Sequence, residues 1–156
     1  MDAGECRLRF AAQRRAVLAT TGLDGVPHLV PVTFALLDGD VVVHAVDHKP
    51  KRTTALRRLR NIGENPHVAF LVDRYTDDWA GLWWVRADAT ASVVDDGPRH
   101  AAAVAALVGR YPQYAEVPPV GPVVWAAVSR WSGWSGAAGS SGGVGAPVAP
   151  VAPVAP

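Results

Sequence analysis

The longest regular pattern in this chain is the stretch LWWVRADATASVV, residues 82–94, in which apolar and mostly polar side chains alternate. Successive side chains of a β-strand point to opposite faces, so an alternation of this length predicts one long strand of a half-buried antiparallel sheet. The second face of this strand places Trp84 beside Arg86. Its buried face is expected to carry the alternate residues Trp83, Val85, Ala87, Ala89, Ala91 and Val93.

Shorter stretches predict the rest of the sheet. RAVLAT (15–20), HVAFLVDRY (67–75) and VVWAAVSRW (123–131) each predict one strand. GLDGVPHLVPVTFALLDGDVVVHAV (22–46) predicts two more, because Asp38-Gly39 is a hairpin signal between two apolar runs. In the first of these two strands, the core face is expected to consist of Val30, Val32, Phe34 and Leu36.

Two helices are predicted between these strands. Residues 51–63 place Ala55, Leu59 and Ile62 on one stripe, and residues 98–110 begin at a proline. With about six antiparallel strands and short connections, the pattern predicts a mainly β fold, a closed or nearly closed barrel with flanking helices. The apolar stripe of the second helix is expected at Ala101, Val104, Ala105 and Val108.

The C-terminal part of the chain has a different composition. Residues 135–156 are rich in Gly and Ser and then repeat Val-Ala-Pro, which buries too little surface to offset the entropy of ordering. We therefore expect one folded domain at 1–134 and a disordered tail at 135–156, with a polyproline-type docking segment as the alternative. The N-terminus lacks the apolar core of a signal peptide, and no apolar run reaches roughly 18 residues, so a cytoplasmic protein without a membrane partner is expected.

Several chemistries are disfavoured by the sequence. The single cysteine, Cys6, excludes an internal disulfide and a cysteine-based zinc site, and the five histidines show no close metal-ligand spacing. The sequence has no G-x-S-x-G nucleophile elbow, no G-x-G-x-x-G after a strand and no Walker sequence. We therefore expect no metal, no hydrolase triad and neither of the common nucleotide-binding α/β folds.

Six of the fifteen Lys and Arg residues fall between positions 49 and 60, in the run HKPKRTTALRRLRN (48–61). Three uses compete: a nucleic-acid patch, a solvated helix face and a socket for a phosphorylated small molecule. The formal net charge is only +1 and no aromatic residues interleave with the run, so nucleic acid ranks last. Arg57, Arg58 and Arg60 lie away from the apolar stripe of the helix, so a solvated face is their default interpretation.

The first part of the basic run lies at a predicted strand-to-helix junction. The unpaired backbone N–H groups and the dipole of a helix start favour an anion there. Lys49, Lys51 and Arg52 add positive charge, and Thr53 and Thr54 add hydroxyl groups at cap positions. We therefore expect this junction to hold a phosphate.

Four segments carry a resemblance when they are taken together and in order: ATTGLDGVPHLVPVTFAL, KPKRTTALRRLRNIGENP, LVDRYTDDWAGLWWVRADATASVVDDGP and the closing RWSGW. They resemble the pyridoxamine 5′-phosphate oxidase-like split-barrel superfamily, in particular its deazaflavin (coenzyme F420)-dependent branch. The resemblance spans about residues 8–134. It implies a six-stranded antiparallel split barrel of the FMN-binding type, which agrees with the barrel predicted from periodicity.

The resemblance also implies a homodimer, with the ring system of the cofactor in a cleft between the subunits. Lys51 and Arg52 match the two basic residues that FMN oxidases place on the FMN phosphate. Trp84 is expected to stack on a ring or to line the substrate cleft, with a place in the dimer interface as the alternative. The backbone near the cofactor ring is expected to come from Val32, Thr33, Ala45 and Val46.

One departure from the FMN oxidases affects the choice of cofactor. Those enzymes carry an Arg and a Lys on the strand where this chain has Val30 and Ala35, which favours the deazaflavin branch. The expected function is that of an oxidoreductase of this class, which uses reduced F420 to deliver a hydride to a small planar or unsaturated acceptor. The alternatives are an FMN-dependent enzyme on the same barrel and a non-catalytic F420 carrier. No acid or base is assigned.

Overall fold

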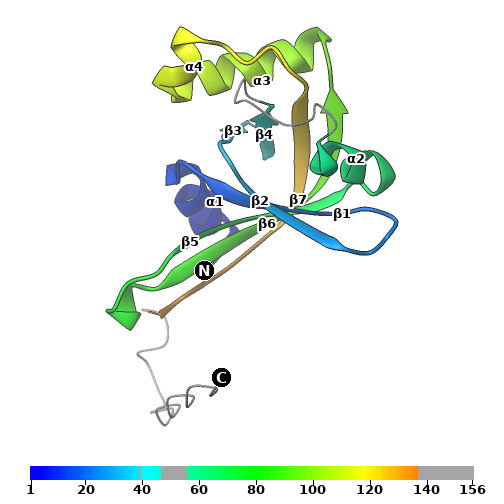
Figure 1. Ribbon diagram of the computed structural model, residues 1–156. Coiled ribbons are helices and arrows are strands. Elements are labelled where there is room, and N and C mark those ends of the chain that lie inside the picture. The colour runs from blue at the N-terminus through cyan, green and yellow to red at the C-terminus, as the bar shows by residue number, and fades with distance from the viewer. Residues whose placement is uncertain (39, 47–55, 137–156) are drawn as a thin grey trace, which may run out of the picture.

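The computed structural model describes residues 1–38, 40–46 and 56–136. Within these residues, seven strands form one antiparallel sheet in the order β2-β1-β5-β6-β7-β4-β3 (Figure 1). The sheet curls, because β2 and β3 lie at opposite ends of this order and yet follow one another in the chain. The strands are β1 (Ala16–Thr21), β2 (Pro27–Val32), β3 (Ala35–Leu37), β4 (Val41–Ala45), β5 (His67–Arg74), β6 (Trp83–Val94) and β7 (Val123–Ser135).

The mainly β split-barrel prediction is confirmed, with seven strands in place of six. The additional strand arises because the predicted strand around residues 28–36 is divided into β2 and β3 at Thr33 and Phe34. Its predicted core face is nevertheless correct: Val32 and Phe34 are buried, and Val30 and Leu36 pack against the same core. The division lets one chain segment pair with both ends of the curled sheet.

Strand β6 follows its period-two pattern closely. All the odd-numbered residues from Trp83 to Ala91 are buried, as predicted, and Val93 is partly buried. β6 pairs with β5 on one side and with β7 on the other, and a β-bulge interrupts the second ladder between Asp88 and Ala89. β7 continues four residues beyond the predicted end at 131 and includes the RWSGW motif up to Ser135.

Helices cover the sheet on several sides (Figure 1). Helix α1 (Ala3–Ala12) was not predicted; it buries Cys6 and Phe10, and the Asp2 carboxylate accepts a hydrogen bond from the Glu5 N–H at its start. Helix α2 (Arg57–Glu64) directs Ile62 and Leu59 to the core as predicted, whereas Ala55 lies outside the described residues. The remaining helices are η1 (Trp79–Gly81), α3 (Gly97–Arg110) and α4 (Pro112–Glu116).

The predicted bounds of α3 agree with the structure to within one residue, but its predicted stripe is wrong except at Val104, which is partly buried against the core. The buried side chains are Ala103 and Leu107, followed by Tyr111 just beyond the helix. The helix is rich in Ala and Val, so more than one stripe satisfies the helical period, and packing against β3 and β4 selects the one that carries the largest side chains. Of the residues predicted for the stripe, none is fully buried: Ala101, Val104, Ala105 and Val108.

The interior consists of two apolar clusters. The larger one lies inside the curl of the sheet, where the Phe10 ring contacts Phe34 and Trp131 at centroid distances of 4.6 and 5.1 Å. The smaller one lies under α3 and includes Val43, Leu107 and residues at the start of β7. In the described part of the chain, no helix is long and apolar enough to cross a membrane. Most of the predicted tail, residues 137–156, lies outside the described residues.

Candidate functional site

Four of the predicted site residues meet at one corner of the barrel, where β2 gives way to β3 beside the end of β4. The register pairs Ala35 with Val43, which brings Thr33 next to the end of β4. His44 Nδ1 and the Thr33 carbonyl oxygen lie 3.0 Å apart. The side chains of Val32 and Ala45 are buried in the core, so these two residues can offer only backbone atoms to a ligand. The corner unites Val32, Thr33, Ala45 and Val46.

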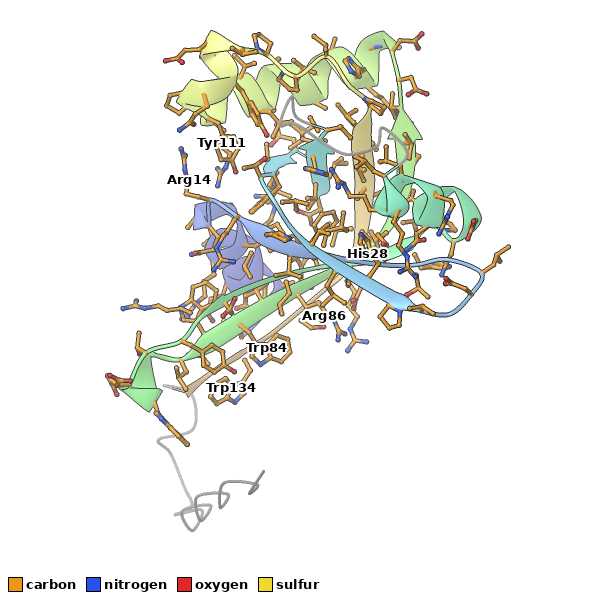
Figure 2. All side chains as sticks on the ribbon, viewed as in Figure 1. Arg14, His28, Trp84, Arg86, Tyr111 and Trp134 are labelled. Carbon is orange, nitrogen blue, oxygen red and sulfur yellow. The ribbon has the colours of Figure 1, made fainter. Side chains whose placement is uncertain are left out.

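Two tyrosines that the sequence analysis did not single out hold this corner. The Tyr111 hydroxyl accepts a hydrogen bond from the Phe34 N–H at 3.1 Å and lies 2.8 Å from the Phe34 carbonyl oxygen and 2.7 Å from that of Arg14. The Tyr114 hydroxyl lies 2.8 Å from the Thr33 hydroxyl. Figure 2 shows Arg14 and Tyr111 side by side at this corner. A spacing of three residues, in Tyr-Pro-Gln-Tyr at the end of α3, is the only sequence signal of the pair.

The loop before β7 closes the corner against the end of β4. The Val46 N–H donates a hydrogen bond to the Pro122 carbonyl at 3.0 Å. A Cβ atom on Gly121 would lie 3.1 Å from the Val46 carbonyl oxygen and 3.2 Å from its Cβ, so only glycine allows this close approach without a shift. His100 Nε2 lies 3.1 Å from the Gly121 carbonyl oxygen, which ties the loop to α3.

The predicted phosphate junction falls largely outside the described residues, which stop at Val46 and resume at Leu56. This gap contains Lys49, Lys51, Arg52 and Thr53, so their assignment stays a prediction. Leu56 is the N-cap residue of α2 and has no side-chain oxygen to accept from the first-turn N–H groups.

The described side of this junction is less exposed than the solvated helix face that was predicted for Arg57, Arg58 and Arg60. Arg60 is exposed, as predicted, and lies 3.7 Å from the Glu64 carboxylate. Arg57 and Arg58, in contrast, are half-buried. Arg57 Nη2 donates a hydrogen bond to the Asp24 carboxylate at 3.2 Å, whereas its Nε is buried and has no hydrogen-bond partner among the described residues. Arg110 also has a buried Nε of this kind, so the donor points to a ligand only together with the positive charges around it.

Arg57 and Arg58 form a cationic cluster, and His28, on β2 (Figure 2), lies close enough to feel the charge of both. Burial lowers the pKa of its imidazole below the ordinary value of 6.5, and the positive charges of Arg57 and Arg58 lower it further. The imidazole is therefore neutral near pH 7 and can accept or donate a hydrogen bond. An anion bound beside these residues would offset the repulsion and raise the His28 pKa.

The structure separates Trp84 from this corner. Trp84 lies on the outer face of the sheet, across the ladders from Asp73 and Trp134. The corner adjoins the opposite end of β6, because Ala45 pairs with Val123 and Val123 pairs with Val94. Ten residues of strand separate Trp84 from Val94, or about 33 Å at about 3.3 Å per residue. Within one chain, Trp84 therefore does not share a site with the other described candidates.

Trp84 instead lines a hollow on the outer face of the sheet. The hollow has a volume of about 470 Å³, and its lining includes Leu71, Tyr75 and Arg86. Figure 2 shows Trp84, Trp134 and Arg86 together at this end of the sheet. A second hollow of about 310 Å³ lies further along β5 and β6 and is lined in part by His67 and Asp88. The Arg86–Asp88 ion pair, with Nε and Oδ1 2.8 Å apart, stands between the two hollows.

No group of three or more His, Cys, Asp or Glu side chains that could hold a metal ion occurs among the described residues. The candidate site thus has two parts: the corner of backbone groups and hydroxyls at Thr33, and the cationic cluster beside His28, five residues or about 17 Å earlier along the chain. Such a set of donors suits an anionic organic ligand better than a metal.

Comparisons with known proteins identify the family of the chain. Residues 3–135 match the sequence profile of a family described as pyridoxamine 5′-phosphate oxidase. A sequence search of curated proteins found no match.

Solved structures share the fold at low sequence identity. A conserved hypothetical protein from Mycobacterium tuberculosis has a TM-score of 0.68 and 22% identity, over 94% of this chain and 93% of that chain. An FAD-binding protein from Mesorhizobium loti has a TM-score of 0.63 and 21% identity, over 85% and 92%. The heme storage protein HutZ from Vibrio cholerae has a TM-score of 0.64 and 16% identity, over 85% and 93%. At these identities the likeness extends to the fold alone.

Proposed function

We propose, from the premise that the chain belongs to the pyridoxamine 5′-phosphate oxidase family, that this protein is an oxidoreductase. Its cofactor would be of the flavin type and would carry a phosphate. The observation that carries the proposal is the cationic cluster at the start of α2. There, a buried Arg57 N–H lacks an acceptor among the described residues, beside a His28 whose charged form is disfavoured. A phosphate would supply the missing acceptor and charge.

Two groups of residues would hold such a cofactor. Its phosphate end would meet Arg57 and the predicted junction of Lys49, Lys51, Arg52 and Thr53. Its ring end would meet backbone groups at the corner formed by Val32, Thr33, Ala45 and Val46. When bound, a flavin or deazaflavin supplies the redox chemistry, and the chain supplies position, charge and a dry surface.

Two observations bear on the choice of cofactor, and they favour different cofactors. Val30 packs against the core and Ala35 is buried, so neither position offers a cation to an FMN phosphate, which favours F420. Two structural neighbours are described as FAD-binding proteins, which favours a flavin. We propose reduced F420 as the hydride donor for a small planar or unsaturated acceptor, with FMN or FAD as the alternative.

In a homodimer, the end of the sheet that carries Trp84 in one chain could lie against the corner of the partner chain. Leu29, Leu71 and Trp134 leave 61%, 37% and 46% of their surfaces exposed on the outer face. Apolar side chains of this kind on one face mark an interaction surface, and we propose that a second copy covers it. Since Trp84 lies about 33 Å along the sheet from the corner, it would reach a bound ring only from the partner chain. Sedimentation of the wild type and a Leu29→Glu variant tests this; a monomeric wild type would exclude it.

Titrating the purified full-length chain with F420, FMN and FAD tests the function. We expect saturable binding of F420 that is tighter than that of either flavin, and weaker binding in the Lys51→Ala, Arg52→Ala double variant at an unchanged melting temperature. Tighter binding of FMN or FAD would overturn the choice of F420. Oxidation of the reduced cofactor across a panel of enones and quinones would distinguish an enzyme from a carrier, which would bind without turnover.

A further inference from the structure

We propose that Tyr114 is a positioning residue of the candidate cofactor site. Its hydroxyl, through the hydroxyl of Thr33, fixes the two residues between β2 and β3 against the end of β4. The inference rests on the proposed function for the identity of the ligand. Its geometry rests on contacts within the described residues.

The two residues between β2 and β3 are held by side chains rather than by strand pairing. The Tyr111 hydroxyl accepts a hydrogen bond from the Phe34 N–H and can donate one to the Phe34 carbonyl oxygen. His44 Nδ1 lies within hydrogen-bond distance of the Thr33 carbonyl oxygen, at 3.0 Å. The Thr33 hydroxyl is then left for Tyr114, at 2.8 Å, and this is the only one of these contacts that joins two side chains.

Tyr111 and Tyr114 therefore have different roles. Tyr111 is buried and satisfies backbone groups, so its hydroxyl is needed for the fold itself. Tyr114 is half-buried on the short helix α4, and its hydroxyl contacts a side chain that could otherwise turn toward water. The two rings meet edge to face with centroids 5.6 Å apart, which orients Tyr114 toward Thr33.

The contact between Tyr114 and Thr33 preorganises the corner for the ligand. Thr33 belongs to the corner whose backbone is proposed to meet the cofactor ring, and a fixed corner loses less conformational entropy when the ligand binds. Removal of either hydroxyl leaves the strands and the Tyr111 and His44 contacts in place but removes the side-chain restraint on Thr33. Cofactor affinity should then fall while the stability of the fold barely changes.

Four full-length variants test this: Tyr114→Phe, Thr33→Val, Thr33→Ser and, as a control on the exposed surface of α4, Gln113→Ala. For each, the dissociation constant of the tightest of F420, FMN and FAD is measured, together with the melting temperature and amide hydrogen exchange of residues 28–37. One neutral hydrogen bond corresponds to a factor of about 2 to 10 in affinity. We expect this weakening in Tyr114→Phe and in Thr33→Val, no further loss in the double variant, and faster exchange of residues 28–37 in both.

Thr33→Ser keeps the hydroxyl and should bind nearly as the wild type does, and Gln113→Ala should match the wild type throughout. Unchanged affinity and exchange in Tyr114→Phe would overturn the inference. So would additive losses in the double variant, or a fall in melting temperature large enough to account for the weaker binding. If the wild type binds none of the three cofactors, the proposed function fails, and the exchange of residues 28–37 still decides whether Tyr114 positions the corner.

Discussion

Replacement of Tyr111 by Phe removes one hydroxyl and keeps the ring. That hydroxyl accepts from the Phe34 N–H and contacts the carbonyl oxygens of Phe34 and Arg14 at 2.8 and 2.7 Å. A hydroxyl has a single proton to donate, so the two carbonyls share it. The variant therefore leaves the Phe34 N–H, and about one carbonyl equivalent, without a partner.

The expected loss of stability follows from this count. Each buried backbone group left without a partner costs about 1–3 kcal/mol, and removal of the hydroxyl returns part of its own desolvation cost. We expect a net loss of about 2–4 kcal/mol in the free energy of unfolding. For a domain of this size, that corresponds to a fall of roughly 5–15 °C in melting temperature.

Urea denaturation and thermal unfolding, followed by circular dichroism, measure the effect. Tyr114→Phe is the matched control. Among the described residues its hydroxyl has one hydrogen-bond partner, the half-buried Thr33 side chain, which water can satisfy, so its loss should shift the melting temperature by no more than about 2 °C. Equal stabilities for Tyr111→Phe and the wild type would show that Phe34 finds other partners. That result would refute the argument that Tyr111 takes the place of strand pairing at the corner.

Three further predictions concern other parts of the molecule. Gly121→Val places side-chain atoms against Val46 and should destabilise the fold by about 1–3 kcal/mol, measured by urea denaturation; wild-type stability would show that the loop before β7 yields. Asn61→Ala removes the buried hydrogen bond to the Thr20 hydroxyl at 3.1 Å and should cost about 1–3 kcal/mol in the same assay. The pKa of His28 is lowered in the fold, so the unfolded chain takes up this proton first as the pH falls below 6.5. Stability should therefore decrease from pH 7 to pH 5, and His28→Gln should flatten that decrease; identical pH profiles would contradict the assignment.

Periodicity predicted the parts of the fold that repeat. The alternation in residues 82–94 identified both the length and the buried face of β6, because the core selects every second side chain. Periodicity did not reveal the division at Thr33 and Phe34, since the even-numbered residues pack against the core on both sides of it. Nor did it identify α1, because its apolar residues are not confined to one stripe: Cys6 and Phe10 are buried, whereas Leu8 is 71% exposed.

The residues of the corner were expected from the resemblance to the split-barrel superfamily and not from a pattern in the sequence. The β3–β4 hairpin does bring Thr33 next to the end of β4. Contacts across 77 and 81 residues, from the two tyrosines to Phe34 and Thr33, depend on how α3 and α4 pack and leave no local signal. Trp84 was assigned to the correct face of its strand, but the pattern contains no information on its distance from the corner.

The central claim is that the chain recognises the phosphate of a flavin-type cofactor at the start of α2. The most direct test compares each cofactor with its ring system lacking the phosphate, for example FMN with riboflavin, by titration of the wild type and of Arg57→Gln. We expect the phosphate to strengthen binding by at least about tenfold in the wild type, as for a charge-assisted contact, and most of this gain to be lost in Arg57→Gln. Equal affinity for the phosphorylated and unphosphorylated forms, or a gain that Arg57→Gln leaves intact, would contradict the account.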